Sequence, residues 1–170
     1  MSLPIPVEPI DPRAAELIRE LHLQPHPEGG FFRELYRSSL RVAPDDGRAV
    51  RSAMTTIYFL LPRGAHSRWH RVESDEVWHL YEGGPLELIL APPGLEEVRR
   101  VVLGPALASD GPVYTVPAGW WQAARPIGIY ALTGCTVAPG FDFVDFSFLR
   151  DAPEVLARLV KIDPRCAEFV

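Results

Sequence analysis

Two stretches of the chain carry residues whose types and spacing are suited to chemistry. The first, residues 64–83, places His70 six positions before Glu76, and the second, residues 111–122, ends at Gln122. An imidazole titrates near neutral pH, and a neighbouring carboxylate tunes it as a general acid or base. We therefore predict His70 and Glu76 as catalytic residues, with Gln122 as a ligand-binding residue beside them.

Side-chain alternation predicts which residues surround this pair. If both stretches form strands, His70 and Val72 face one way, and Glu76 and Trp78 share a face. Trp120 shares a face with Gln122 in the same manner. We expect Trp78 and Trp120 in the wall of a mostly apolar cavity, where Trp120 would stack on a flat ligand. The alternative for these aromatic residues is ordinary core packing.

A third segment offers two further ligand-binding candidates. In residues 31–38, Phe32, Glu34 and Tyr36 lie on one face at a period of two. If that face lines the cavity, Glu34 adds a carboxylate and Tyr36 a phenol. If it does not, both residues lie on the edge of a sheet and contact no ligand.

The remaining histidines are weaker candidates. His79 faces away from Glu76 by alternation and is expected to pack against another layer or a second subunit. His66 lies in a turn and is expected to face solvent or the pocket rim. We assign no chemistry to His22 and His26, which flank the end of a predicted helix.

Two interpretations of His70 remain open at the level of sequence. In the functional one, Glu76 poises the imidazole as an acid/base group or an anchor for a ligand. In the structural one, His70 is held by Glu76 inside the fold without a catalytic role. Stability and binding of a His70→Ala variant distinguish them.

The elements that must position these residues are mostly strands. Asp11 followed by Pro12 is typical of a helix start, and we predict a helix over 11–22 after an extended arm at 1–10. The sequence Asp-Ala-Pro-Glu at 151–154 resembles a capping box for a last helix over 152–161. Short apolar segments separated by Gly and Pro predict strands at about 31–38, 54–61, 67–72, 75–81, 85–91, 97–103, 112–116, 119–124, 127–137 and 141–148. A β-bulge is expected between Phe143 and Val144, where the apolar phase changes.

Length and composition bound the class of protein. The chain has 170 residues, 18 Pro and 13 Gly, which favours one domain rich in turns over long helices. The net charge is −5 with no basic run beyond two residues, so neither nucleic acid nor a membrane is expected as a partner. Two cysteines and no secretory signal indicate the cytoplasm. Many short strands predict an all-β sandwich or barrel.

The spacing of the two stretches resembles the two signatures of the cupin superfamily. The first reads Gly64-x5-His70-x-Val72-x3-Glu76-x6-Gly83, and the second reads Gly111-x5-Pro117-x-Gly119-x2-Gln122. The resemblance implies a double-stranded β-helix, or jelly roll, over residues 30–148. In metal-binding cupins three histidines and one glutamate point into the barrel. Here Val72 and Gln122 occupy two of the histidine positions.

The absence of these two histidines lowers the expected affinity of the chain for a metal ion. One imidazole, one carboxylate and one amide make a poor site for zinc or iron, which prefer more nitrogen or thiolate ligands. We therefore expect no metal and no other cofactor in this chain.

The resemblance extends to a small single-domain cupin family of bacteria and fungi, whose members are largely uncharacterised. The segments that carry it are 25–37, 56–61, 69–79, 116–122 and 136–143. It implies a homodimer with a cavity of ligand size. By fold analogy the nearest enzymes are dTDP-keto-sugar epimerases, which are metal-free cupins with a histidine base and a tyrosine acid.

These observations lead to one main hypothesis and two rivals. The main one is a cytoplasmic cupin dimer that binds a small polar, sugar- or nucleotide-like molecule, with isomerase or epimerase chemistry at His70. The first rival is a metal-dependent dioxygenase or isomerase that uses His70, Glu76 and Gln122. The second is a non-catalytic sensor or storage-type binding module.

Overall fold

The computed structural model describes residues 9–170, so most of the arm predicted at 1–10 lies outside the described residues. Its helices are α1 (Pro12–Glu20) and α2 (Pro153–Ile162), with 3-10 turns η1 (Phe143–Asp145), η2 (Leu149–Asp151) and η3 (Pro164–Phe169). The strands are β1 (Gln24–Pro25), β2 (Phe31–Arg37), β3 (Arg41–Val42), β4 (Arg51–Ser52), β5 (Thr55–Pro62), β6 (Ser67–Val72), β7 (Asp75–Gly83), β8 (Leu86–Ala91), β9 (Arg99–Leu103), β10 (Val113–Val116), β11 (Trp121–Pro126), β12 (Tyr130–Ala138) and β13 (Phe146–Phe148).

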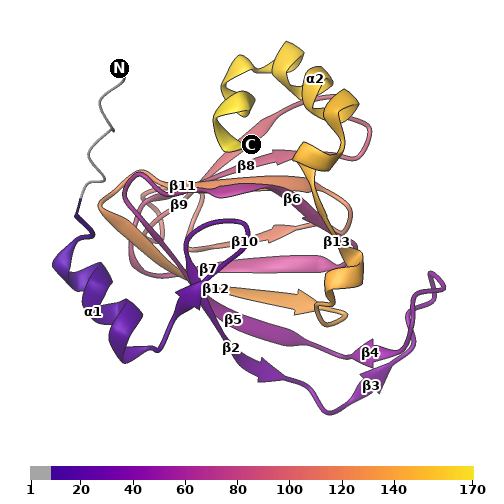
Figure 1. Ribbon diagram of the computed structural model, residues 1–170, viewed down its shortest axis with the longest axis horizontal. Coiled ribbons are helices and arrows are strands. Elements are labelled where there is room, and N and C mark those ends of the chain that lie inside the picture. Colours follow the sequence, from indigo (N-terminus) through magenta and orange to yellow (C-terminus); the bar gives the residue numbers. More distant parts are fainter. Residues whose placement is uncertain (1–8) are drawn as a thin grey trace, which may run out of the picture.

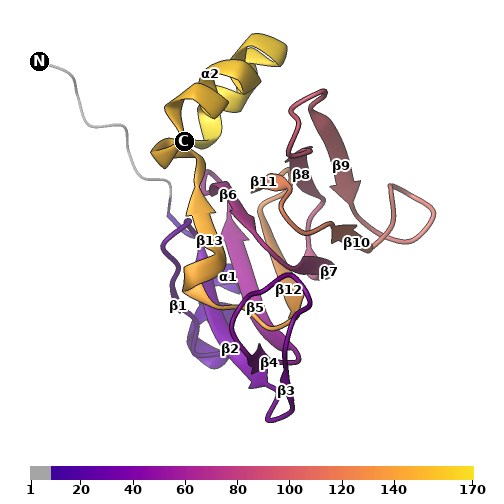
Figure 2. The same ribbon diagram turned by 90° about the vertical axis from the view of Figure 1, so that its right-hand side faces the viewer.

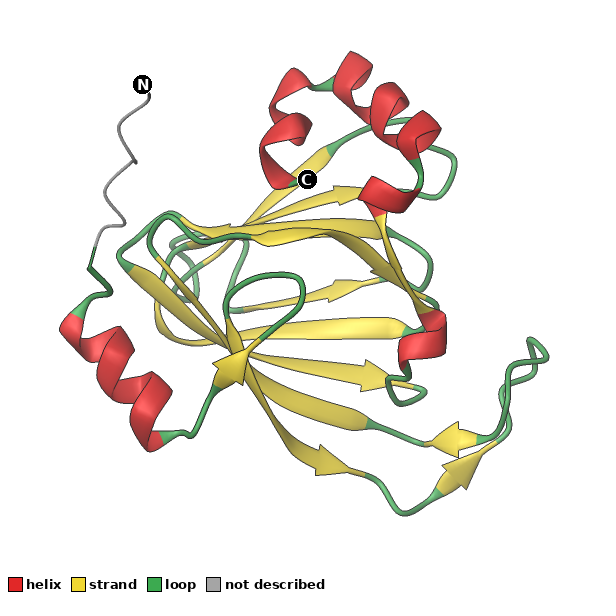
Figure 3. Ribbon diagram, in the orientation of Figure 1, coloured by secondary structure: helices red, strands yellow, loops and turns green. Residues whose placement is uncertain are grey.

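Two antiparallel sheets face each other and form the body of the molecule (Figure 1, Figure 2). The larger has the order β1-β2-β5-β12-β7-β10, and the smaller has the order β13-β6-β11-β8-β9. Strands β3 and β4 form a separate pair. The chain passes repeatedly between the two sheets, which is the jelly-roll arrangement. The predicted all-β class with a short helix at each end is confirmed (Figure 3).

Period-two alternation divides the apolar side chains into two layers. Phe59, Trp78 and Leu88 point between the sheets and belong to the main core. Trp69 and Trp121 point out of the smaller sheet, where they pack against α2 and η3. The two faces of the smaller sheet therefore serve different cores, and a shift of one residue in β6 or β11 would exchange them.

The N-terminal helix begins as predicted. Asp11 caps it by accepting hydrogen bonds from the backbone N–H groups of Arg13 and Ala14 at 2.9 and 3.3 Å. Ala14 and Leu17 pack on the outer face of the larger sheet at one end. No helix among residues 9–170 has the length and apolar character that a bilayer crossing requires.

Two local predictions are wrong. Residues 143–145 form the 3-10 turn η1 instead of a bulged strand, because Asp142 accepts a hydrogen bond from the N–H of Val144 at 3.1 Å and turns the chain. The expected capping box is not formed either. Asp151 ends η2, and Ala152 precedes α2 with no side-chain cap.

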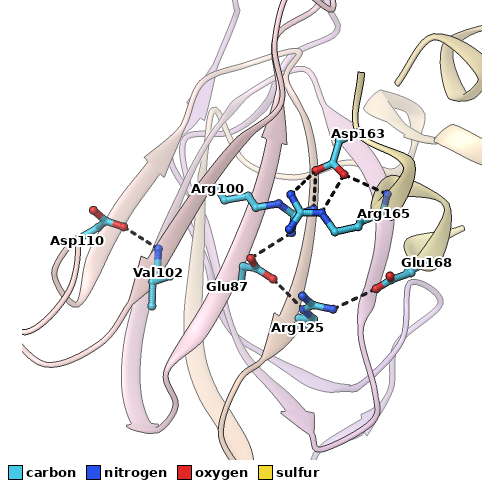
Figure 4. Close-up of polar contacts among 8 residues, drawn as sticks. All are labelled: Glu87, Arg100, Val102, Asp110, Arg125, Asp163, Arg165 and Glu168. Carbon is cyan, nitrogen blue, oxygen red and sulfur yellow. Dashed lines mark hydrogen bonds and ion pairs between the residues drawn. The ribbon is translucent and has the colours of Figure 1, made fainter. Parts of the chain in front are cut away.

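A charged network fastens the C-terminal segment to the smaller sheet (Figure 4). Arg100 donates to Glu87 at 3.1 Å and to Asp163 at 2.9 Å. Arg125 donates to the other oxygen of Glu87 at 2.8 Å and to Glu168 at 3.1 Å. These bonds link β8, β9 and β11 to Asp163, between α2 and η3, and to Glu168 of η3, so the C-terminal segment is attached to the outer face of the smaller sheet.

Candidate functional site

A cavity of about 340 Å³ lies between the two sheets, next to η1. One part of its wall is polar and titratable, and the rest is aliphatic or aromatic. Its lining residues are His26, Glu28, Phe32, Glu34, Arg37, Thr55, Ile57, His70, Val72, Glu76, Cys135, Val137, Phe141, Asp142, Phe143 and Phe146. Strands β2, β5, β6, β7 and β12 supply most of this wall, so the site stands on the rigid part of the fold.

His70 is held firmly in this wall. It lies on β6 directly opposite Gln122 of β11, and only 3% of it is exposed. Its Nδ1 is 2.7 Å from the carbonyl oxygen of Arg68 and 3.0 Å from a carboxylate oxygen of Glu28. The ring is stacked on Phe146, with 5.4 Å between the centroids. Because these polar contacts use Nδ1, which must carry a proton to donate, Nε2 is the nitrogen left for a ligand.

Glu28 is the residue that sequence reasoning missed. It lies in the turn between β1 and β2 and is 6% exposed. The backbone N–H of Arg68 donates to the Glu28 carbonyl at 2.8 Å, which docks the turn onto β6. Gly29 permits this close approach, since it has φ +113° and a Cβ there would collide with the carbonyl oxygen of His66. Two consecutive glycines after Glu28 were the signal for such an approach.

His26, to which no chemistry was assigned, enters the cavity from the same turn. Its Nδ1 accepts a hydrogen bond from the N–H of Glu28 at 3.2 Å. Its ring packs edge-on against Phe32, with 4.5 Å between the centroids. Burial lowers the pKa of His26 below its usual value, which favours a neutral ring. His26 therefore orders the turn that presents Glu28.

Glu76 belongs to a buried hydrogen-bonded chain on the other side of the cavity. Gln122 donates to one oxygen of Glu76 at 2.5 Å and accepts from the indole N–H of Trp78 at 3.0 Å. Glu76 is 7% exposed and Gln122 only 1%. Trp78 thus orients the amide of Gln122, which in turn fixes Glu76 and leaves the other carboxylate oxygen for the cavity.

The pKa values of His70, Glu28 and Glu76 depend on one another and on burial. Burial opposes the charged form of His70, but the attraction of Glu28 and the hydrogen bond that Nδ1–H donates to it outweigh burial and raise the His70 pKa to about 9. Burial also opposes ionisation of Glu28, yet the pairing with His70 lowers the Glu28 pKa. Burial, helped by repulsion from Glu28, raises the Glu76 pKa to about 7 despite the attraction of His70. At neutral pH the site holds a Glu28–His70 ion pair and a Glu76 that readily takes up or releases a proton.

The face predicted for β2 is interrupted by a bulge. The pairing with β5 shifts between Glu34 and Tyr36, so Glu34 lies opposite Ile57 and Arg37 lies opposite Thr55. Glu34 and Arg37 therefore line the cavity, whereas Tyr36 does not and is 50% exposed. Alternation alone could not foresee this, because one extra residue reverses the faces beyond it.

The two predicted tryptophans lie behind the cavity and not in its lining. Trp78 is 1% exposed in the main core, where it packs edge-on against Phe59. Trp120 packs on the same core beneath the guanidinium of Arg99, which is 5.5 Å from the ring centroid.

The other histidines lie away from the cavity lining. His66 is half-buried against Phe169, so the prediction that it faces solvent or the rim is wrong. His79 is stacked on Tyr81, on the outer face of the larger sheet as alternation predicted.

The metal of metal-binding cupins does not fit the residues present. Val72 has no donor atom, and both polar ends of the Gln122 amide are occupied by Trp78 and Glu76. Within residues 9–170, no group of three or more His, Cys, Asp or Glu side chains is arranged to hold a metal ion. We derive no chemistry through a metal.

Protein purified without chelators is expected to contain Zn, Fe, Mn and Ni well below one atom per chain, because the donor set is poor. Elemental analysis by mass spectrometry measures this directly. Near-unit occupancy by one metal that is lost in Gln122→Ala would contradict the expectation, since it would show that the amide serves as a ligand.

The facing sheets, the two glycine-bounded signatures and the enclosed site define a cupin-type barrel. The chain belongs to the family described as Cupin superfamily (DUF985), whose profile matches residues 15–149. The predicted family resemblance is thereby confirmed.

Several proteins resemble this chain closely. A hypothetical protein from Leishmania major has 32% sequence identity and a TM-score of 0.76, with 88% of this chain and 97% of that chain covered. Protein SO0799 from Shewanella oneidensis has 34% identity and a TM-score of 0.73, with 88% and 96% covered. An uncharacterized protein of Saccharomyces cerevisiae, YML079W, is 27% identical over 172 residues, which covers 91% of this chain and 83% of the yeast protein.

Proposed function

We propose that this protein binds a small, polar, sugar- or nucleotide-like carbonyl compound in its barrel and acts on it as an isomerase or epimerase. The observation that carries the proposal is the pairing of Glu28 with Nδ1 of His70 at 3.0 Å in the wall of a cavity that also contains Glu76. Two groups with separated pKa values, about 9 for His70 and about 7 for Glu76, suit the roles of acid and base.

The roles follow from the protonation states. His70 is an imidazolium at neutral pH, so its Nε2–H donates to the carbonyl oxygen of the substrate. The free oxygen of Glu76 accepts a proton from the adjacent carbon, the C–H electrons form a carbon–carbon double bond, and the carbonyl oxygen takes the proton of Nε2. The result is an enediol. Glu76 then returns the proton to the former carbonyl carbon. The hydroxyl group on the other carbon of the enediol loses its proton to Nε2 of His70, and this gives the isomer.

This assignment revises the predicted pairing of His70 with Glu76. Glu28 holds His70 through Nδ1, while Glu76 is held by Gln122 and interacts with His70 through charge. Glu28 is thus a positioning residue, and Glu76 is the base.

Proton transfer is tested by NMR detection of deuterium uptake at carbon when ketoses and aldoses are incubated with the protein in D2O. The exchange rate is expected to rise as the pH passes about 7, when Glu76 ionises, and to fall as it passes about 9, when His70 loses its charge. Glu76→Gln keeps the shape and should slow exchange by about 10²-fold or more. Binding without any exchange would instead support a non-catalytic sensor or storage module.

We also propose a homodimer. Helix α1 covers one end of the outer face of the larger sheet, and Tyr36, Tyr81 and Val113 on the rest of that sheet are 50, 55 and 46% exposed. A two-fold contact through this face would bury them.

Light scattering at micromolar concentration is expected to give twice the chain mass of 19.0 kDa. Tyr81→Glu should shift the mass toward that of the monomer, because a charge at a two-fold interface is buried twice. A monomeric mass for the unmodified protein would refute the dimer.

We further propose a cytoplasmic location, since Cys135 and Cys166 are buried free thiols.

A further inference from the structure

The cavity wall carries more negative than positive groups. Its charged side chains are the carboxylates of Glu28, Glu34, Glu76 and Asp142, the imidazolium of His70 and the guanidinium of Arg37. The positive charge of His70 is already matched by Glu28 at 3.0 Å. Arg37 is therefore the cation that would have to receive an anionic ligand.

Each of the three guanidinium nitrogens of Arg37 already donates one hydrogen bond. Its Nε and Nη2 donate to the two oxygens of Glu34 at 3.1 and 2.7 Å, which is a bidentate ion pair. Its Nη1 donates to the carbonyl oxygen of Phe141 at 3.0 Å. A phosphate that approached Arg37 would compete with the carboxylate of Glu34 and would meet that of Asp142 in the same wall.

The part of this wall next to η1 is aromatic. Phe141, Phe143 and Phe146 contact one another edge-on, with centroid separations of 5.0 to 6.3 Å. Phe143 is 63% exposed, so it stands at the opening. Aromatic faces pack on the C–H face of a sugar ring and bring no charge to a phosphate.

We propose that the opening of the cavity excludes anions, which narrows the sugar- or nucleotide-like class of the proposed function to uncharged sugar-like carbonyl compounds and leaves out phosphorylated and nucleotide-linked sugars. Glu34 is the specificity-determining residue, because it neutralises Arg37. The substrate class rests on the proposed function, whereas the exclusion of anions depends on charge alone and is testable without turnover.

The test uses inorganic phosphate as the probe and the Nε–H signal of Arg37 in an NMR titration as the readout. The wild-type protein is expected to show no saturable shift. Glu34→Gln frees the guanidinium while keeping the side-chain shape, and its affinity for phosphate should exceed that of wild type by about tenfold or more. Adding Asp142→Asn should increase the affinity further.

Glu97→Gln is the matched control, because Glu97 and Arg99 form an ion pair of similar exposure outside the cavity lining. It should leave the Arg37 signal unaffected by phosphate. Saturable phosphate binding by the wild type, or no gain in Glu34→Gln, would overturn the exclusion of anions. A lack of deuterium uptake by neutral sugars would overturn the proposed reaction instead, so the two failures are distinct.

Discussion

Replacing His70 with alanine is expected to slow deuterium uptake by about 10²- to 10⁴-fold, the usual contribution of a positioned acid or base. The same change leaves the Glu28 carboxylate buried without its partner at 3.0 Å. Removing one member of a buried ion pair destabilises a protein by about 3–5 kcal/mol, so unfolding should require correspondingly less denaturant. Contrary to the expectation from the sequence, the alanine variant alone does not separate a catalytic from a structural role, because Glu28 loses its partner in either case.

Two further variants of His70 make the separation. Asparagine keeps a donor near the position of Nδ1, so it can still satisfy Glu28, but it lacks Nε2. His70→Asn should retain most of the stability and lose exchange as completely as alanine. His70→Gln offers a donor near Nε2 and serves as the matched comparison. Exchange at the wild-type rate in His70→Asn would contradict the assignment of Nε2 as the group that contacts substrate.

The second large effect is expected for Glu28→Gln. This change removes the charge that raises the His70 pKa to about 9, so the pKa should fall toward and below its unperturbed value of 6.5 as burial takes over. The variant should be less stable than wild type by about 3–5 kcal/mol near pH 6, where His70 is charged in both folded and unfolded wild-type protein.

The stability difference between wild type and Glu28→Gln depends on pH, because the folded protein binds the His70 proton more tightly than the unfolded chain does. A raised histidine pKa contributes stability that is fully present below 6.5 and is lost as the pH rises through about 9. The stability difference between wild type and Glu28→Gln should therefore shrink across that interval. Denaturant unfolding at several pH values measures the difference, and an NMR titration of the His70 ring measures its pKa. A His70 pKa that stays near 9 in Glu28→Gln would show that another group stabilises the imidazolium.

Glu76→Gln provides an internal check on this interpretation. Burial raises the Glu76 pKa to about 7, so Glu76 favours the folded state when protonated and opposes it as the pH rises from 4.5 through 7. The glutamine variant should thus gain stability relative to wild type as the pH rises from 4.5 to 7, a lower interval than the one from 6.5 to 9 over which the deficit of Glu28→Gln shrinks. Glu28 and Glu76 therefore have different roles in one cavity, because Glu28 is paired with His70 and Glu76 is not.

Local patterns in the sequence determined much of the architecture. The spacing of His70, Glu76 and Gln122 between glycines predicted that these residues lie on strands, and the cupin resemblance implied that their inward faces meet; Gln122 does donate to Glu76 at 2.5 Å. Alternation placed His70 and Val72 in the cavity wall and His79 outside it. Asp11 and Pro12 marked the start of α1. These features were predictable because strand alternation and helix capping depend on neighbouring residues alone.

Only the tertiary structure decided how the site is completed. Glu28 lies far from His70 in sequence and reaches it because its turn docks on β6 through the N–H of Arg68. Arg37 replaced Tyr36 in the wall because a bulge in the pairing with β5 reversed the faces. The alternation of side chains within a segment does not determine which strand it pairs with or in which register, since both depend on contacts between residues distant in the chain. The sequence by itself thus determined which groups can do chemistry, and the packing of a turn and a bulge decided which charges surround them.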